Sequence, residues 1–146
     1  MDCIEQAVNE FKAGFNCCQS VFVPFAAQMG LERDTALKLA TGFGAGMARQ
    51  QETCGAVVGA YLALGLGFGR TKVEDEFARD ETYMYMLDFT EEFVKLHGSI
   101  NCKALLGCDL STAEGQKQFN KHNLMENVCT NCVGDAAGIL EEFIKF

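Results

Sequence analysis

The stretch ETCGAVVGAYLALGLGFG (residues 52–69) decides how the rest of this chain is arranged. It carries no charge after Glu52 and contains five glycines. It is shorter than the roughly 20 apolar residues that span a bilayer, so it predicts a buried helix and no membrane insertion. Gly55, Gly59 and Ala63 recur every four residues, which leaves one helix face nearly bare. Another helix, or a cofactor bound at Gly55 and Gly59, can approach that face closely.

The composition predicts one folded domain, which we assign to residues 1–146. The chain has 146 residues, and 49% of them are hydrophobic, which is enough to bury a core without cross-links. Its formal net charge of −8 argues against a nucleic-acid partner, because phosphate binding requires a cationic surface. The same charge argues against binding to anionic membrane surfaces.

Hydrophobic residues recur with helical spacing along nearly the whole sequence. For example, Ile4, Ala7, Val8 and Phe11 fall on one face of a helix. We therefore predict an all-α fold, a small bundle of about six or seven helices with a buried Gly-rich central helix. The predicted helices span residues 2–14, 17–30, 35–50, 54–69, 71–96, 112–123 and 128–146.

The helix boundaries follow from capping residues and helix breakers. Asn16, Asp34 and Thr53 are expected to cap the second, third and fourth helices. Pro24 should kink or divide the second helix, because it lacks an N–H and clashes with the preceding turn. The glycine series at positions 42, 44 and 46 is expected to interrupt the third helix.

The longest predicted helix, residues 71–96, has a broad apolar face rich in Met and aromatic residues. A helix of this length reaches about 39 Å, which extends beyond a compact core. We therefore expect a homodimer that forms through this helix.

Eight cysteines are many for a chain without signs of secretion. The opening MDCIEQAVNEF carries acidic residues and lacks the basic start and apolar run of a signal peptide, so we expect a cytoplasmic protein. Structural disulfides are rare in that reducing compartment. The thiols therefore require another role, as core residues, metal ligands or redox groups.

Several cysteines lie where the pattern predicts the first turn of a helix. They are Cys17 and Cys18 after Asn16, Cys54 after Thr53, Cys102 after Asn101, and Cys129 and Cys132 of the motif CTNC. Unpaired N–H groups and the helix dipole stabilise a thiolate at such a position, whereas a structural thiol gains nothing there. For Cys54 taken alone, an inert thiol at a tight helix crossing remains an open alternative.

Common cysteine motifs do not fit this sequence. A zinc ribbon requires two C-x-x-C motifs where this chain has one, and the ferredoxin run C-x-x-C-x-x-C does not occur. A thioredoxin-like C-x-x-C would lie in a βαβ context, which is not predicted. His97 and His122 lack the spacing of a ligand pair, and we expect His97 to be a capping cation or a solvated group at the end of the long helix. A Cys–His catalytic pair is a further alternative.

Four blocks of the sequence together resemble a known family. They are NCCQSVF (residues 16–22), ETCGAVVGA (52–60), GSINCKALLGCDLS (98–111) and CTNCVGDAAGILEEF (129–143). In this order they resemble the C_GCAxxG_C_C family, whose members are small helical proteins suspected of redox activity. The resemblance assigns the four defining cysteines to Cys17, Cys54, Cys102 and Cys129, with Cys18 and Cys132 as alternatives for the first and the last.

Three hypotheses follow for the function. In the first, these four thiols converge from separate helices on an iron–sulfur cluster or other metal centre for electron transfer, since four thiolates match its ligand count. In the second, Cys129 and Cys132, or Cys54 and a facing thiol, form a cofactor-free thiol–disulfide redox pair. In the third, the chain is a structural helical oligomerisation module with inert thiols. The two redox hypotheses imply an oxidoreductase component or electron carrier with an unidentified redox partner protein.

Overall fold

The Gly-rich stretch forms helix α5 (Gly55–Phe68) in the computed structural model, which describes residues 2–146. This helix packs against α2 (Cys17–Gln28), α6 (Glu76–His97) and α9 (Asn131–Phe143). Residues 55–60 of α5 are all buried, and so are Ala63 and Leu64. Removal of this apolar surface from water is the main force that holds the four helices together.

The glycine-bearing face of α5 lies against α2. A Cβ atom at Gly59 would come within 2.7 Å of the carbonyl oxygen of Cys18 and 3.1 Å of the side chain of Val21. The two helix backbones can approach this closely only because Gly59 has no side chain. A second helix therefore occupies the bare face at this level.

Eight regular helices make up the fold, and no strand occurs in residues 2–146. The four helices not yet given are α1 (Cys3–Ala13), α3 (Arg33–Ala40), α7 (Cys102–Leu106) and α8 (Ala113–Lys121). The all-α prediction is confirmed, but the expected six or seven helices were too few. The sequence pattern missed α7, because five residues are too short to display a helical period.

The second helix begins as predicted and continues through the proline without a break. Asn16 caps α2 through a reciprocal capping box with Gln19. The helix then runs through Pro24 to Gln28, so the predicted division at the proline is wrong.

Two of the predicted caps lie at neighbouring residues instead. Glu32, rather than Asp34, caps α3 with its side chain. Cys54 itself, rather than Thr53, occupies the N-cap position of α5. The second shift matters for the chemistry, because it places the sulfur where a capping side chain meets the free N–H groups of the first turn.

The glycine series interrupts the third helix, as predicted. A 3-10 turn, η1 (Thr41–Phe43), and the short segment α4 (Gly44–Met47) follow α3. The backbone is left-handed, with positive φ, at Ala45, Gly46, Met47, Ala48, Arg49 and Gln51. This conformation costs a non-glycine residue about 1–2 kcal/mol, so contacts with the rest of the molecule must hold the segment in place.

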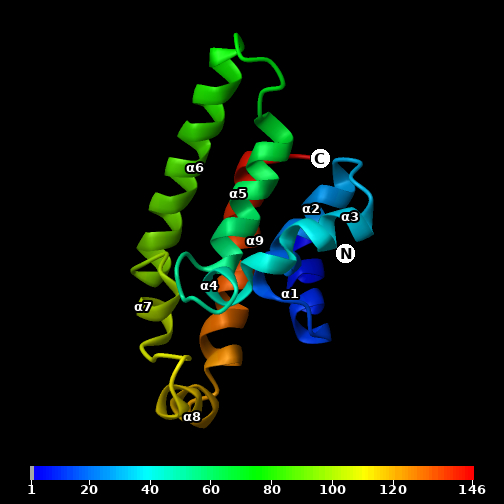
Figure 1. Cartoon of the computed structure of the whole chain (residues 1–146). Coiled ribbons are helices and arrows are strands. Elements are labelled where there is room, and N and C mark those ends of the chain that lie inside the picture. The colour runs from blue at the N-terminus through cyan, green and yellow to red at the C-terminus, as the bar shows by residue number, and fades with distance from the viewer. Residues whose placement is uncertain (1) are drawn as a thin grey trace.

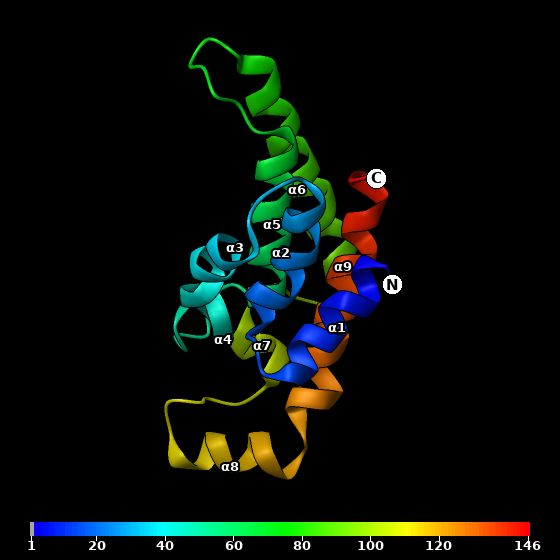
Figure 2. The same ribbon diagram turned by 90° about the vertical axis from the view of Figure 1, so that its right-hand side faces the viewer.

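α6 lies beside α5, and the connection between them projects at one end of the molecule, opposite α8 (Figures 1 and 2). Asp75 caps α6, so residues 71–75 of the predicted long helix lie outside it. On the outer side of α6, Phe77, Met84 and Leu87 are each more than half exposed. Within the described residues, no helix combines the length and the apolar character needed to cross a membrane.

Candidate functional site

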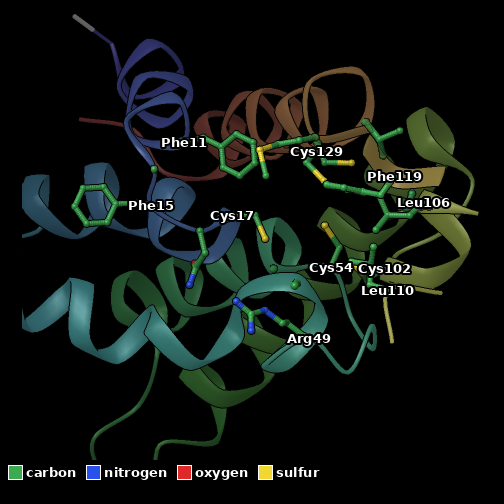
Figure 3. Close-up of a pocket in the computed structure, with 18 residues that line it drawn as sticks. Phe11, Phe15, Cys17, Arg49, Cys54, Cys102, Leu106, Leu110, Phe119 and Cys129 are labelled. Atoms are coloured by element: carbon green, nitrogen blue, oxygen red, sulfur yellow. The ribbon is translucent and has the colours of Figure 1, made fainter. Parts of the chain in front are cut away.

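Five of the eight cysteines line one cavity of about 370 Å³. They are Cys17 and Cys102, which begin α2 and α7; Cys54 at the N-cap of α5; Cys129 in the π-helical turn η2 (Met125–Thr130); and Cys132 in the first turn of α9. Figure 3 shows the labelled thiols around this space, each from a different element. Residues far apart in the sequence thus meet here, and all eight cysteines are free thiols.

Backbone hydrogen bonds bring Cys54 next to Cys102. The N–H of Cys54 donates to the carbonyl of Ile100 at 2.6 Å, and the N–H of Cys102 donates to the carbonyl of Glu52 at 2.6 Å. The left-handed segment passes close to this contact. A Cβ atom at Gly46 would lie 2.8 Å from the Cβ of Cys102, so no side chain fits there.

Cys54 is the thiol whose surroundings favour the ionised form. The Cys132 thiol donates a hydrogen bond to its sulfur and lowers the pKa of Cys54 from 9.0 to about 7, although burial opposes this change. The backbone N–H groups of Ala56 and Val57 lower the pKa of Cys54 further. These groups belong to the first turn of α5, where N–H groups have no partner within the helix. Near neutral pH, Cys54 is therefore present in large part as a thiolate.

Cys17 occupies a tighter position on the other side of the cavity. A Cβ atom at Gly55 would lie 2.3 Å from its sulfur, so the start of α5 leaves room for this thiol by having no side chain. Burial, followed by the charge of Cys54, raises the pKa of Cys17, although backbone N–H groups, including that of Ala45, oppose the increase. Cys17 is therefore a protonated thiol at neutral pH.

The other cavity thiols also hold their protons. Burial raises the pKa of Cys102 to about 12 and that of Cys129 to about 12, and the charge of Cys54 adds to both increases. For Cys132, the hydrogen bond that it donates to Cys54 is the largest cause of a raised pKa, ahead of burial. Cys54 is thus the one thiol of the cavity that ionises near neutral pH, because an ionised sulfur disfavours ionisation of its neighbours.

The remaining walls of the cavity are almost entirely apolar. They include Phe11, Phe15, Leu105, Leu106, Leu110, Phe119, Met125 and Val128. Arg49, in the left-handed segment, also lines the cavity; it is positively charged and exposed to solvent. An apolar chamber with a few polar groups is typical of a site for a small molecule or for an inserted side chain.

The comparison with protein families agrees with the resemblance found in the sequence. The model of the family described as "Putative redox-active protein (C_GCAxxG_C_C)" matches residues 15–143, which is nearly the whole chain. The chain belongs to this family. No curated protein and no solved structure matches it. The description assigns redox activity to the C_GCAxxG_C_C family and specifies neither reaction nor cofactor.

The C_GCAxxG_C_C cysteines share a cavity, but their side chains do not form a metal-binding arrangement. No group of three or more His, Cys, Asp or Glu side chains within residues 2–146 is placed to hold a metal ion. We therefore derive no step through a metal ion or an iron–sulfur cluster. The ligand set Cys17, Cys54, Cys102 and Cys129 stays a prediction.

The two glycines predicted to bind a cofactor have different surroundings in this family member. Gly55 lines the cavity beside Cys54. Gly59 lies one turn further along α5, and the backbone of α2 covers it at Cys18. Contact with a bound molecule is thus open to Gly55, while Gly59 has a packing role.

Three cysteines lie outside the cavity. Cys3 and Cys18 are buried in the hydrophobic core, where burial raises the pKa of each thiol. Cys108 is half-buried in the loop after α7. Its carbonyl accepts a hydrogen bond from the side chain of Gln51, which also binds the N–H of Leu110. This pair of bonds fixes the loop, and no sequence motif indicated Gln51.

Neither His97 nor Asp135 was identified from the sequence as a residue of the site. Nδ1 of His97 lies 3.9 Å from the sulfur of Cys132, and Nε2 lies 2.9 Å from Oδ2 of Asp135. His97 was expected to be a capping cation or a solvated group, whereas its side chain is only 15% exposed. Since 35 residues or more separate His97 from these two partners, sequence spacing contains no signal for the cluster.

Proposed function

We propose that this protein is a thiol–disulfide redox protein in which Cys54 is the attacking thiolate and Cys132 is the resolving thiol. The observation that carries the proposal is that Cys54 and Cys132 line the same cavity, where the Cys132 side chain lowers the pKa of Cys54 to about 7. A disulfide can form only between sulfurs whose carbon atoms already lie close together. Two interacting thiols, one at the N-cap of α5 and one just after the junction of η2 and α9, are suited to this exchange.

The reaction proceeds through a mixed disulfide. The Cys54 thiolate attacks one sulfur of a substrate disulfide, a bond forms between the two sulfurs, and the other substrate sulfur leaves as a thiolate. Cys132 then loses its proton and attacks the sulfur of Cys54. The Cys54–Cys132 disulfide forms, and the second substrate thiolate leaves. Two electrons have passed from the cysteine pair to the substrate disulfide, and a dithiol donor returns them by the reverse sequence.

The cavity supports a substrate disulfide with an apolar body. Phe11, Phe15 and Phe119 on its walls offer aromatic surface and no charge. The other cavity thiols are protonated, because burial raises the pKa of Cys102 and Cys129 to about 12. A substrate that enters the cavity therefore meets one sulfur nucleophile, and attack at the other thiols is slow.

The test is mild oxidation of anaerobically purified protein with oxidised glutathione, followed by thiol counting and peptide mapping. We expect the count of free thiols to fall by two and the map to show one disulfide, Cys54 to Cys132. In Cys54→Ser, oxidation should leave the number of free thiols unchanged. In Cys108→Ser, whose substituted residue lies outside the cavity, the number of free thiols should still fall by two. A stable product with glutathione on Cys54 and no disulfide to Cys132 would overturn the proposal.

The same preparation tests the metal hypothesis. A brown protein with stoichiometric iron bound through Cys17, Cys54, Cys102 and Cys129 would replace the dithiol function, because a cluster ligand is not free to exchange disulfides. A colourless, metal-free protein that gains one disulfide supports the dithiol pair. Slow and unselective alkylation of all thiols would support the third hypothesis, inert thiols in a helical oligomer.

We further propose that two copies pair through α6. Phe77, Met84, Leu87 and Val94 are exposed on this helix at intervals of seven, three and seven residues, which is the spacing of a coiled-coil seam. Glu91 interrupts the seam, so we expect a weak dimer. Light scattering over a concentration series should show a mass that approaches twice that of the monomer, and Leu87→Glu should keep it at the monomer value.

A further inference from the structure

The end of α6 presents a histidine to the resolving thiol. His97 is the last residue of α6, and its ring lies between two side chains of α9. Nδ1 is 3.9 Å from the sulfur of Cys132, and Nε2 is 2.9 Å from Oδ2 of Asp135. Cys132 and Asp135 are three residues apart in one helix, so both side chains project from the same face.

The packing around the ring fixes its orientation. The ring of Phe93, which is fully buried, lies 4.6 Å from the imidazole between centroids. The side chain of His97 is 15% exposed, whereas that of Asp135 is 47% exposed. The imidazole therefore stays in contact with the Cys132 sulfur, and the outer side of the cluster can exchange a proton with water.

The hydrogen bonds determine which nitrogen can accept a proton. A carboxylate only accepts hydrogen bonds, so a neutral imidazole beside Asp135 carries its proton on Nε2. This assignment of the tautomer follows from the hydrogen-bond network. Nδ1 is then an unprotonated acceptor that faces the Cys132 thiol. When Nδ1 takes up a proton, the carboxylate of Asp135 stabilises the resulting imidazolium.

We infer that His97 is the base that removes the proton of Cys132 in the resolving step, with Asp135 as its positioning residue. This inference rests on the proposed exchange between Cys54 and Cys132. In the resting protein, the thiolate of Cys54 accepts the hydrogen bond of Cys132. Once Cys54 has formed the mixed disulfide, its sulfur is neutral, and Nδ1 of His97 becomes the acceptor next to the thiol.

The proton transfer completes the balance of the reaction. The proton passes from the Cys132 sulfur to Nδ1, the new thiolate forms a bond to the Cys54 sulfur, and the substrate thiolate leaves. The imidazolium later releases the proton to water on the exposed side of the cluster. Such a base is needed because the hydrogen bond to Cys54 and burial raise the pKa of Cys132, which leaves little of it ionised at neutral pH.

The experiment follows the two steps separately after mixing with the aromatic disulfide dithionitrobenzoate. Acid quenching and peptide mapping measure the mixed disulfide on Cys54 and then the Cys54–Cys132 disulfide. His97→Asn should slow the second step at neutral pH by about 100-fold, the lower end of the range for loss of a general base. The first step should change less than about 2-fold, since His97 does not contact Cys54. Asp135→Asn should slow the second step to a smaller extent.

The pH dependence distinguishes a base from a structural residue. The titratable groups facing the ring are Asp135 and Cys132 from α9, with Cys54 from α5 next to Cys132. Without the base, the second step depends on spontaneous ionisation of Cys132, so the deficit of His97→Asn should shrink as the pH rises. His122→Asn, at the other histidine, is the matched control and should behave as the wild type.

The outcomes separate this inference from the proposed function. If the wild type forms the mixed disulfide but never the Cys54–Cys132 disulfide, the proposed function fails, and the inference fails with it. If the disulfide forms but His97→Asn and Asp135→Asn resolve at the wild-type rate, only the inference is overturned. An equal deficit at every pH would also overturn it, because that result indicates a structural role.

Discussion

The starts of α2 and α5 carry cysteines in similar positions, yet the pKa values of the two thiols move in opposite directions. Cys17 is the first residue of α2, where backbone N–H groups point at its sulfur, but burial and the charge of Cys54 raise its pKa. Cys54 caps α5, where backbone N–H groups again point at the sulfur, and its pKa falls to about 7. The two sites differ in their nearest sulfur neighbour. Cys54 has the Cys132 thiol beside it, which lowers its pKa, whereas Cys17 has the negative charge of Cys54 beside it, which raises its pKa.

This difference shows that a helix N-terminus alone does not make a cysteine reactive. The N–H groups and the dipole supply a modest favourable interaction, and burial of the charged sulfur can exceed it. A donated hydrogen bond from a second thiol decides the outcome at Cys54. The same donor is the resolving partner in the proposed reaction, so one contact both activates the nucleophile and places the group that completes the exchange.

The largest expected effect is the loss of that donor. In Cys132→Ala, the pKa of Cys54 should rise from about 7 toward its ordinary value of 9.0. The thiolate fraction at pH 7 then falls from about one half to roughly 1%. The measurement is the rate of Cys54 alkylation at a series of pH values, with peptide mass spectrometry as the readout; the pH midpoint of this rate gives the pKa. Because the hydroxyl of Cys132→Ser still donates a hydrogen bond, that variant should keep a low midpoint. An unchanged midpoint in Cys132→Ala would mean that the N–H groups at the start of α5 lower the pKa of Cys54 without help from Cys132.

The second effect concerns the contact between the two helix starts. Gly55→Ala would place a Cβ atom 2.3 Å from the Cys17 sulfur and 2.8 Å from the carbonyl oxygen of Phe43. We expect urea unfolding to show a loss of about 1–3 kcal/mol in the free energy of unfolding, as for other overpacked sites.

Gly65→Ala in the same helix is the matched control for that substitution. No heavy atom lies within 4 Å of the Cβ position at Gly65, so this variant should gain up to about 1 kcal/mol from better helix propensity. Equal effects at the two glycines would show that α2 and α5 are not in contact at Gly55.

The smallest effect is electrostatic. The charge of Cys54 is the second cause of the raised pKa of Cys17, after burial. Cys54→Ala removes that charge, so the pH midpoint of Cys17 alkylation should move lower while remaining above the ordinary value. Cys108→Ala removes a thiol that is not among the causes at Cys17, and it should leave the midpoint unchanged. A higher midpoint in Cys54→Ala would contradict the proposed charge on Cys54.

Local features of the fold were accessible from the sequence because they depend on neighbouring residues. The capping box at Asn16, the interruption at the glycine series and the helical period of the long segments all act within a few residues. The prediction failed where the signal was too short or where tertiary packing prevailed. α7 has only five residues, and Pro24 lies inside a helix that is buried on several sides and does not break.

The candidate site was accessible only in part. The resemblance indicated four cysteines, and all four line the cavity. The choice of Cys132 as partner of Cys54, the hydrogen bonds of Gln51, and the cluster of His97 with Asp135 depend on contacts between helices. No sequence period or spacing encodes these contacts, because they depend on how the helices pack.

By itself, the sequence determined that the chain is helical, that Cys17, Cys54 and Cys102 lie at helix starts, and that it belongs with the C_GCAxxG_C_C proteins. These properties depend on composition, short-range pattern and motif order. Only the tertiary structure decided which thiol is ionised and which group faces it. The physical reason is that a pKa depends on burial and on charges and donors within a few ångströms of the atom, and here those groups come from other helices.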